Sequence, residues 1–262
     1  MKIELISSQP KDKIHSTPLL FIHGKWHGAW CWLENFLPYF ADHGYTSHAV
    51  SLRGHGESDG LQHLRWTSIA DYVADVAGVA GQMGTDPVLI GHSMGGYITQ
   101  KYLETHIAPA AVLLAPIPPS GLGPATWNFF RRHPLVFLNA ILTMRLYPIV
   151  ATLELAREAL FSSDMPDAKV VHYQARLGDD SFRAYMDELG LNLVTPKCVK
   201  TPMLVIGAEN DKLIPLKGIH STARAYGTNA VILPNSSHDM MLGSTWQAVA
   251  DRILEFLKER GI

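Results

Sequence analysis

The chain has 262 residues, of which 47% are hydrophobic and 18% are charged, and its formal net charge is −2. This composition is ordinary for a globular protein that buries a large core, and the length fits one α/β domain. The mixed, nearly balanced charges argue against a basic nucleic-acid-binding surface and against a polybasic membrane anchor. We therefore expect no nucleic acid among the partners.

The N-terminus and the two cysteines bear on where the protein resides. Residues 1–14 are polar and lack the apolar core of a signal peptide. The most apolar long stretch, residues 135–151, is interrupted by polar residues and a proline, so it is a poor membrane span. Cys31 and Cys198 lie far apart and match no metal-binding spacing, so we expect no disulfide. These features predict a cytoplasmic protein without integral membrane association.

Short apolar runs alternate with stretches of helical periodicity along the first half of the chain. The apolar runs predict buried strands, and the periodic stretches predict helices. Continuous apolar strands that alternate with helices indicate an α/β fold, with a mostly parallel sheet covered on both faces. The expected strands are residues 18–23, 47–52, 87–91 and 110–115, and the expected helices are residues 27–43, 68–82 and 93–106.

The alternation stops near residue 117 and resumes after residue 196. An all-helical insertion between two strands of such a sheet is typical of a lid over an active site. We therefore expect a core of residues 1–116 and 197–262 and a helical lid of residues 117–196. Lid helices are expected near residues 127–130, 135–147, 151–160, 168–177 and 180–190, followed by strands at 202–207 and 230–233 and a helix at 244–258.

A nucleophile is indicated where the third expected strand meets its helix. Gly91-His-Ser-Met-Gly95 matches the G-x-S-x-G pattern in the strand–turn–helix context that the pattern requires. A nucleophile there needs a sharp turn that projects its oxygen from the sheet, and flanking glycines relieve the crowding. The alternative is a glycine-lined turn with an incidental serine. We favour Ser93 as a nucleophile.

A serine hydroxyl needs an adjacent base, which in turn needs an acid to orient it. Among thirteen histidines we favour His238, because it follows the last expected strand and precedes the last helix. Asp211 and Glu209 both follow the preceding strand; we favour Asp211, with Glu209 in reserve, because it lies further past the strand. The alternative for each is a solvated loop residue. Residues 116–121, where an alternative acid would lie, contain no carboxylate.

The loop after the first long expected strand is the candidate for one side of an oxyanion hole. One donor in such sites is the backbone N–H that follows the nucleophile, here Met94, and the other comes from this loop. Gly24 allows a turn there, so Lys25 is the natural second donor. We expect His23 to fasten the loop and Trp26 to reach a substrate pocket.

These segments resemble a known family. The chain is similar to the α/β-hydrolase superfamily over nearly its whole length apart from the lid. The loop His23-Gly-Lys-Trp-His-Gly-Ala-Trp-Cys-Trp32 and the run His238-Asp-Met-Met-Leu242 resemble the branch of plant methylesterases and hydroxynitrile lyases. The turn-rich run Ser51-Leu-Arg-Gly-His-Gly-Glu-Ser58 is more similar to bacterial esterases and lysophospholipase-like hydrolases. The resemblance implies a triad of Ser93, Asp211 and His238, with Lys25 and Met94 as oxyanion donors.

Two departures from the branch bear on the chemistry. The lyases have a hydroxyl residue where this chain has Gly24, which favours hydrolysis over cyanohydrin cleavage. The methylesterases usually have a small residue where this chain has Lys25. Its side chain either attracts an anionic substrate or points to solvent, and the sequence leaves that choice open.

The sequence therefore predicts a serine hydrolase that cleaves a carboxylic ester of a small molecule through an acyl-enzyme, without a cofactor. Three alternatives keep the same fold: a carbon–carbon hydrolase or cofactor-free heteroaromatic enzyme, a ligand-binding module with slow hydrolysis, and an interfacial lipase. His23 and His27 have helical metal-ligand spacing, but their loop context and the lack of a third ligand argue against a metal. The lid's aromatic residues either line an acyl site or fix the lid to the core.

Overall fold

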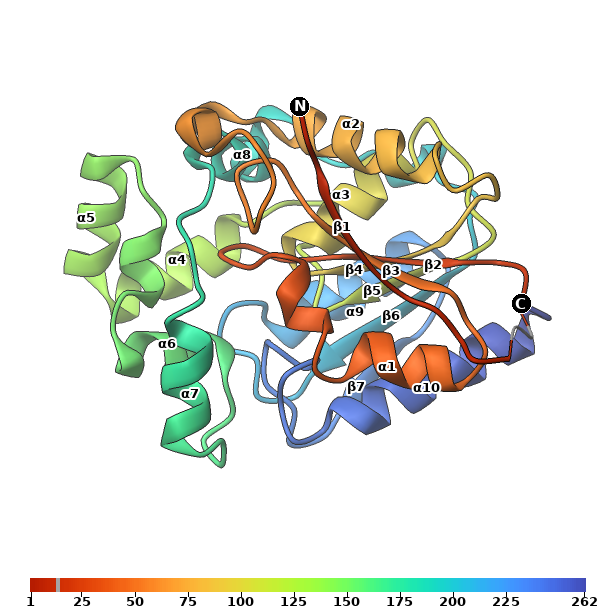
Figure 1. Cartoon of the computed structure of the whole chain (residues 1–262). Coiled ribbons are helices and arrows are strands. Elements are labelled where there is room, and N and C mark those ends of the chain that lie inside the picture. Colours follow the sequence, from red (N-terminus) through yellow and green to blue (C-terminus); the bar gives the residue numbers. More distant parts are fainter. Residues whose placement is uncertain (13–14) are drawn as a thin grey trace.

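A seven-stranded sheet forms the centre of the molecule in the computed structural model, which describes residues 1–12 and 15–262 (Figure 1). Residues 13 and 14, which fall in the predicted core, lie outside the described residues. The strand order is β1-β3-β2-β4-β5-β6-β7, and only β1 is antiparallel to its neighbour among these strands. The predicted α/β class with a mostly parallel sheet is confirmed. The strands are β1 (Glu4–Ser8), β2 (Leu19–Ile22), β3 (Ser47–Ser51), β4 (Val88–His92), β5 (Ala111–Leu114), β6 (Met203–Ala208) and β7 (Ala230–Leu233).

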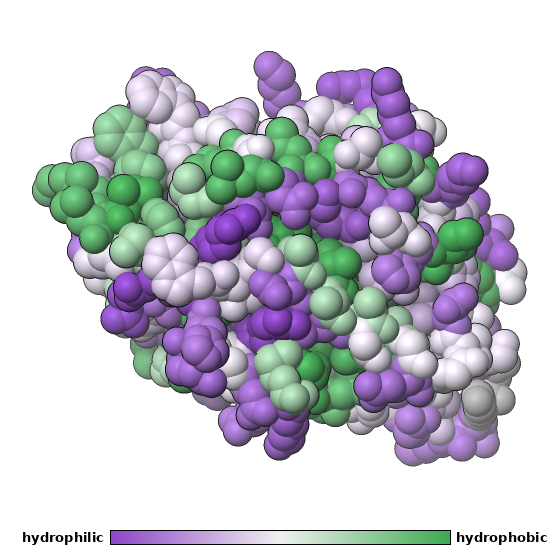
Figure 2. Space-filling model, turned by 90° about the horizontal axis from the view of Figure 1, so that it is seen from above, coloured by the Kyte–Doolittle hydropathy of each residue, from purple (hydrophilic) through white to green (hydrophobic). Residues whose placement is uncertain are grey.

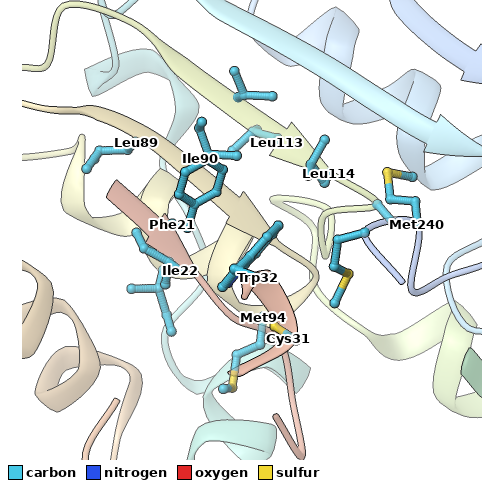
Figure 3. Close-up of a cluster of buried hydrophobic side chains, with 14 of the residues drawn as sticks. Phe21, Ile22, Cys31, Trp32, Leu89, Ile90, Met94, Leu113, Leu114 and Met240 are labelled. Carbon is cyan, nitrogen blue, oxygen red and sulfur yellow. The ribbon is translucent and has the colours of Figure 1, made fainter. Parts of the chain in front are cut away.

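The middle strands are buried on both faces, which explains their unbroken apolar sequence. Every residue of β2, β4, β5 and β6 is buried. Figure 3 shows Phe21 and Ile22 of β2 close to Ile90 of β4, with Trp32 packed beside them. The Phe21 and Trp32 ring centroids lie 5.1 Å apart. This core fixes the strand ends that carry the site.

Helices cover both faces of the sheet (Figure 1). The helices α1 and α10 pack together on one face, whereas α2 and α3 pack together on the other. Ser68 caps α2 through a reciprocal capping box with Asp71, which explains why this helix begins where the sequence predicts. These helices are α1 (Phe36–Asp42), α2 (Ile69–Ala80), α3 (Met94–Tyr102), α9 (Leu216–Ala225) and α10 (Trp246–Glu259).

One expected helix is wrong. Instead of a single helix over residues 27–43, the chain forms a 3₁₀ turn η1 (Ala29–Trp32) and then the short helix α1. Pro38 lies in the first turn of α1, where its missing N–H costs nothing; further inside a longer helix it would break the backbone hydrogen bonding. The sequence prediction also omitted β1, α9 and a 3₁₀ turn η2 (Leu61–Trp66).

The segment between β5 and β6 is helical. In Figure 1, α4 to α7 lie together beyond the carboxyl ends of the strands, and α8 lies near α2. None of the helices in the described parts of the chain is long and apolar enough to cross a bilayer. The segment contains α4 (Gly123–Arg132), α5 (Pro134–Thr143), η3 (Tyr147–Val150), α6 (Leu153–Leu160), α7 (Asp167–Gln174), α8 (Phe182–Met186) and a π-helical turn η4 (Asp187–Leu191), with a short turn η5 (Pro196–Cys198) after it.

Candidate active site

Ser93 lies on a strained turn between β4 and α3. Its backbone has φ 52° and ψ −114°, a left-handed φ that costs a non-glycine residue energy and is common at functional sites. The turn is possible because Gly95 has no side chain: a Cβ there would collide with the Ile22 carbonyl of β2. The hydroxyl therefore projects from the sheet at the N-terminus of α3, as the sequence predicts.

The structure brings the three predicted triad residues together. The Ser93 Oγ lies 3.0 Å from His238 Nε2, and Asp211 Oδ2 lies 2.7 Å from His238 Nδ1. Both the His238 and the Asp211 side chains are buried. Glu209, the reserve acid, is exposed and instead accepts a hydrogen bond from the backbone N–H of Asn235 at 3.0 Å. It supports the loop that carries His238 without touching the imidazole.

Asp211 is fixed on its other side by the backbone. Its Oδ1 accepts hydrogen bonds from the N–H groups of Leu213 and Ile214 at 2.8 and 2.9 Å. Burial alone would lower the pKa of His238, but the charge and hydrogen bond of Asp211, with the charge of Asp239, raise it above its usual value. This carboxylate therefore both orients the imidazole and stabilises its protonated form.

The backbone N–H groups of Lys25 and Met94, the two predicted oxyanion donors, have no hydrogen-bond acceptor among the described residues. The neighbouring Trp26 has φ 66°, and its N–H donates to Asp180 Oδ2 at 2.9 Å. A Cβ at Gly24 would lie 2.9 Å from Ser93 Cβ, so glycine lets this loop approach Ser93 closely. In this loop the Trp26 N–H is therefore occupied, whereas the Lys25 N–H is not.

The Lys25 side chain takes a course that the sequence does not predict. Its Nζ lies 2.8 Å from Glu188 Oε2 in η4, and both side chains are buried. The alternative in which it points to solvent is therefore wrong, and its charge is already paired. Burial raises the pKa of Glu188 to about 7, against the opposing effect of the Lys25 charge.

The histidines around the site hold its loops together. The Leu52 N–H donates to His23 Nε2 at 3.0 Å, so His23 fastens the loop to the segment after β3, as predicted. His27 donates from Nδ1 to the Lys25 carbonyl at 2.6 Å, and its Nε2 lies 2.9 Å from Asp239 Oδ2. His92 donates from Nε2 to the His238 carbonyl at 2.9 Å. Burial and the neighbouring His238 lower the pKa of His92 to about 3.

One group of potential metal ligands occurs among the described residues. The ligand atoms of His92, His238 and Asp239 lie within 4.8 Å of one another. Each of these side chains already has a protein partner, since His238 lies between Asp211 and Ser93 and Asp239 pairs with His27. These contacts account for the cluster.

An apolar cavity opens above Ser93. Lys25, Trp26 and Ser93 form its floor, and α4 and α5 contribute six of the thirteen other lining residues. Trp26 is held by a hydrogen bond from its Nε1 to the Leu146 carbonyl at 3.2 Å. The remaining lining residues are Ile117, Leu122, Ala125, Thr126, Phe129, Phe137, Ala140, Ile141, Leu146, Ile149, Tyr185, Leu213 and Ile214.

The aromatic residues of the helical segment do not all have one of the two predicted roles. Phe129 and Phe137 line the cavity, whereas Trp127 faces outward with 58% exposure. Figure 2 shows hydrophobic residues gathered at the left edge, where Figure 1 places α5. Leu135 and Leu142 of α5 are 80% and 73% exposed. Helix α5 is therefore apolar on the side that lines the cavity and also on its outer side.

Three buried acids around the loop of residues 23–28 are not predicted by the sequence: Asp180, Glu188 and Asp239. Asp239 directly follows His238 and is completely buried, which its local sequence does not indicate. Asp180 contacts Trp26 across 154 residues of sequence. No local pattern could have connected these positions.

The sheet order, the strained turn at Ser93 and the convergence of a serine, a histidine and an aspartate define an α/β-hydrolase fold. A profile described as the alpha/beta hydrolase family matches residues 19–252. The chain therefore belongs to the alpha/beta hydrolase family.

Several proteins of known name or structure are similar to the chain. A pyrethroid hydrolase of Sphingobium wenxiniae is 25% identical over 233 residues, which cover 85% of this chain and 81% of the relative. BpoC of Mycobacterium tuberculosis H37Rv, assigned as a non-heme bromoperoxidase, superposes with a TM-score of 0.79 over 99% of this chain and 97% of that one, at 19% identity. An esterase of Exiguobacterium antarcticum superposes with a TM-score of 0.72 over 98% and 96% of the two chains, at 17% identity. At these identities the structural likeness establishes the fold alone.

Proposed function

We propose that the protein hydrolyses a carboxylic ester of a small, largely apolar molecule through an acyl-enzyme on Ser93. The observation that carries the proposal is the hydrogen-bonded series Ser93–His238–Asp211 at the floor of an apolar cavity, with contacts of 3.0 and 2.7 Å. A nucleophile, a base and an orienting acid in this arrangement are what acyl transfer requires.

In the proposed reaction, His238 takes the proton of Ser93 as the hydroxyl attacks the ester carbonyl. The N–H groups of Lys25 and Met94 stabilise the tetrahedral oxyanion, and a donor of this kind is worth about 10²- to 10³-fold in kcat. His238 then protonates the leaving alcohol, and a water molecule activated by the same imidazole releases the acid. Asp211 holds the imidazole in the required tautomer throughout.

The lining of the cavity supports an uncharged substrate with an apolar part. The cavity wall is almost entirely aliphatic or aromatic, and the ammonium group of Lys25 is paired with Glu188. We place the Trp26 ring against the bound substrate and assign residues 117–196 the role of a lid that excludes water from the acyl-enzyme. The relative named as a pyrethroid hydrolase is consistent with a hydrophobic ester.

Ser93→Ala tests the proposal. We expect the variant to lose hydrolysis of short-chain nitrophenyl esters by at least about 10³-fold, because the covalent step is impossible. Thermal unfolding should change little, since the residue lies at the floor of a cavity. In wild type, a fluorophosphonate should label Ser93 completely and abolish turnover. Undiminished turnover by Ser93→Ala would overturn the proposal, whereas slow wild-type turnover with tight product binding would support a ligand-binding module instead.

A further inference from the structure

The loop of residues 23–28, which carries the proposed oxyanion donor Lys25 and is called the oxyanion loop below, is held by residues of the helical segment. Asp180 accepts the Trp26 N–H at 2.9 Å and lies 3.2 Å from His55 Nε2, and the Gly178 N–H donates to the Trp26 carbonyl at 2.9 Å. Burial opposes ionisation of Asp180, but the Lys25 charge and the contact with His55 outweigh it and lower its pKa. The backbone on the carboxyl side of Lys25 is thus fixed by two residues of the helical segment, Gly178 and Asp180.

Glu188 holds the same loop through a side chain. Its carboxylate lies 2.8 Å from Lys25 Nζ, and no surface of Glu188 is exposed. Glu188 is itself fixed, because its carbonyl accepts the Leu122 N–H at 2.9 Å and leaves no space for a Cβ at Gly121. Leu122 lines the cavity, so the pair connects the cavity wall to the loop.

The loop contains a strained backbone conformation, which these contacts hold in place. Trp26 has φ 66°, a backbone conformation that is strained for a non-glycine residue and persists only where the surroundings impose it. Lys25 directly precedes Trp26, so relaxation of this φ would turn the Lys25 N–H relative to Ser93. Oxyanion donors act only when they are held in place before the charge develops.

We propose that Glu188 is a positioning residue, which fixes the Lys25 backbone N–H in the oxyanion hole through its ion pair with the Lys25 side chain. The proposal rests on the function proposed above and extends it. In this proposal the helical segment both covers the cavity and positions a group that takes part in catalysis. A buried ion pair adds little net stability and is costly to break, so a role in precise placement fits its energetics.

Glu188→Gln is the direct test, because glutamine has the same shape and removes the charge. We expect kcat for a nitrophenyl ester to fall about 10- to 100-fold, part of the value of one oxyanion donor, with KM within about twofold of wild type. A trifluoromethyl ketone, whose adduct with Ser93 places an oxyanion in the hole, should lose affinity by the same factor. The matching methyl ketone should bind as it does to wild type.

The matched control is Asp187→Asn in the same helical turn. Asp187 is also buried, but it accepts the Ile69 N–H at 3.0 Å and pairs with Arg183, so it does not touch the oxyanion loop. This variant should keep kcat and the trifluoromethyl ketone affinity within about twofold. Equal losses in both variants would show general damage to η4 and overturn the proposal.

If Glu188→Gln folds poorly, a second variant can test the proposal instead. Replacing both partners, Lys25→Met with Glu188→Met, substitutes an apolar contact for the ion pair and commonly preserves stability. It should fold and still show the loss of kcat. Wild-type kcat in a folded Glu188→Gln or double variant would overturn the proposal. Ser93→Ala separates the two hypotheses: if it is inactive while Glu188→Gln is unaffected, only the role of Glu188 fails.

Discussion

Asp211 determines the protonation of His238, and this has a measurable consequence. The hydrolytic reaction needs a neutral imidazole that can accept the Ser93 proton. Burial lowers the pKa of His238, but the raising effect of Asp211 and Asp239 is larger, so the net shift is upward from 6.5. The protonated, inactive form therefore persists to higher pH than for an ordinary histidine.

We expect kcat/KM for a nitrophenyl ester to rise with pH to a plateau, with its midpoint above pH 6.5. In Asp211→Asn the raising charge is removed, so the midpoint should move to lower pH, and the plateau should fall by about 10⁴-fold because the amide favours the wrong tautomer. Rate measurements from pH 5 to 9 on both proteins check this. A wild-type midpoint below 6.5, or one that Asp211→Asn leaves in place, would contradict the assignment.

At the scale of elements, the helix pair α4–α5 controls the depth of the cavity. Ala140 lies on the inner side of α5, is buried and lines the cavity, so a larger side chain there has to project into the space above Ser93. The outer side of the same helix is exposed at Leu138 and Leu142. One helix therefore offers a position that changes the cavity and positions that do not.

We expect Ala140→Phe to lower kcat/KM for a nitrophenyl octanoate or longer ester about 10-fold or more, because each methylene excluded from an apolar pocket costs about 1 kcal/mol. Hydrolysis of nitrophenyl acetate should change less than threefold. Leu138→Phe, on the exposed side of α5, is the control and should preserve the chain-length profile. If both variants showed the same profile as wild type, α5 would not border the acyl site.

The sequence predicted most elements and the three side chains that the structure brings together, because each of these residues lies in a short segment at the carboxyl end of a strand. Ser93 is identified by flanking glycines, and His238 and Asp211 by their places after β7 and β6. The expected helix over 27–43 failed because periodicity outweighed Pro38 in the prediction. Asp180 and Glu188 were out of reach, because acids in a helical segment have the pattern of a solvated face and only the tertiary fold buries them.

At the scale of the whole molecule, the two cysteines differ in their exposure and so can be used to measure opening of the core. Cys198 is exposed in η5 and Cys31 is buried in η1, and both are free thiols. Cys31 is 1% exposed within the core that Figure 3 shows, next to Trp32, and burial raises the pKa of its thiol well above the usual value. A thiolate at Cys31 therefore requires that the core around η1 opens.

In native protein we expect Ellman's reagent to modify Cys198 rapidly and Cys31 only as fast as the core opens. Saturating trifluoromethyl ketone binds the folded site alone, so at 100 times its Kd it should add about 2.7 kcal/mol of stability and slow Cys31 labelling about 100-fold. Labelling of Cys198 should be unaffected, and Cys198→Ser should lose only the rapid phase. Two thiols that react at the same rate in native protein would mean that the segment leading from the oxyanion loop to η1 is not held by the core. Lys25 and Trp26 closely precede η1 in the chain, so this measurement tests whether the segment that carries them is held in the native protein.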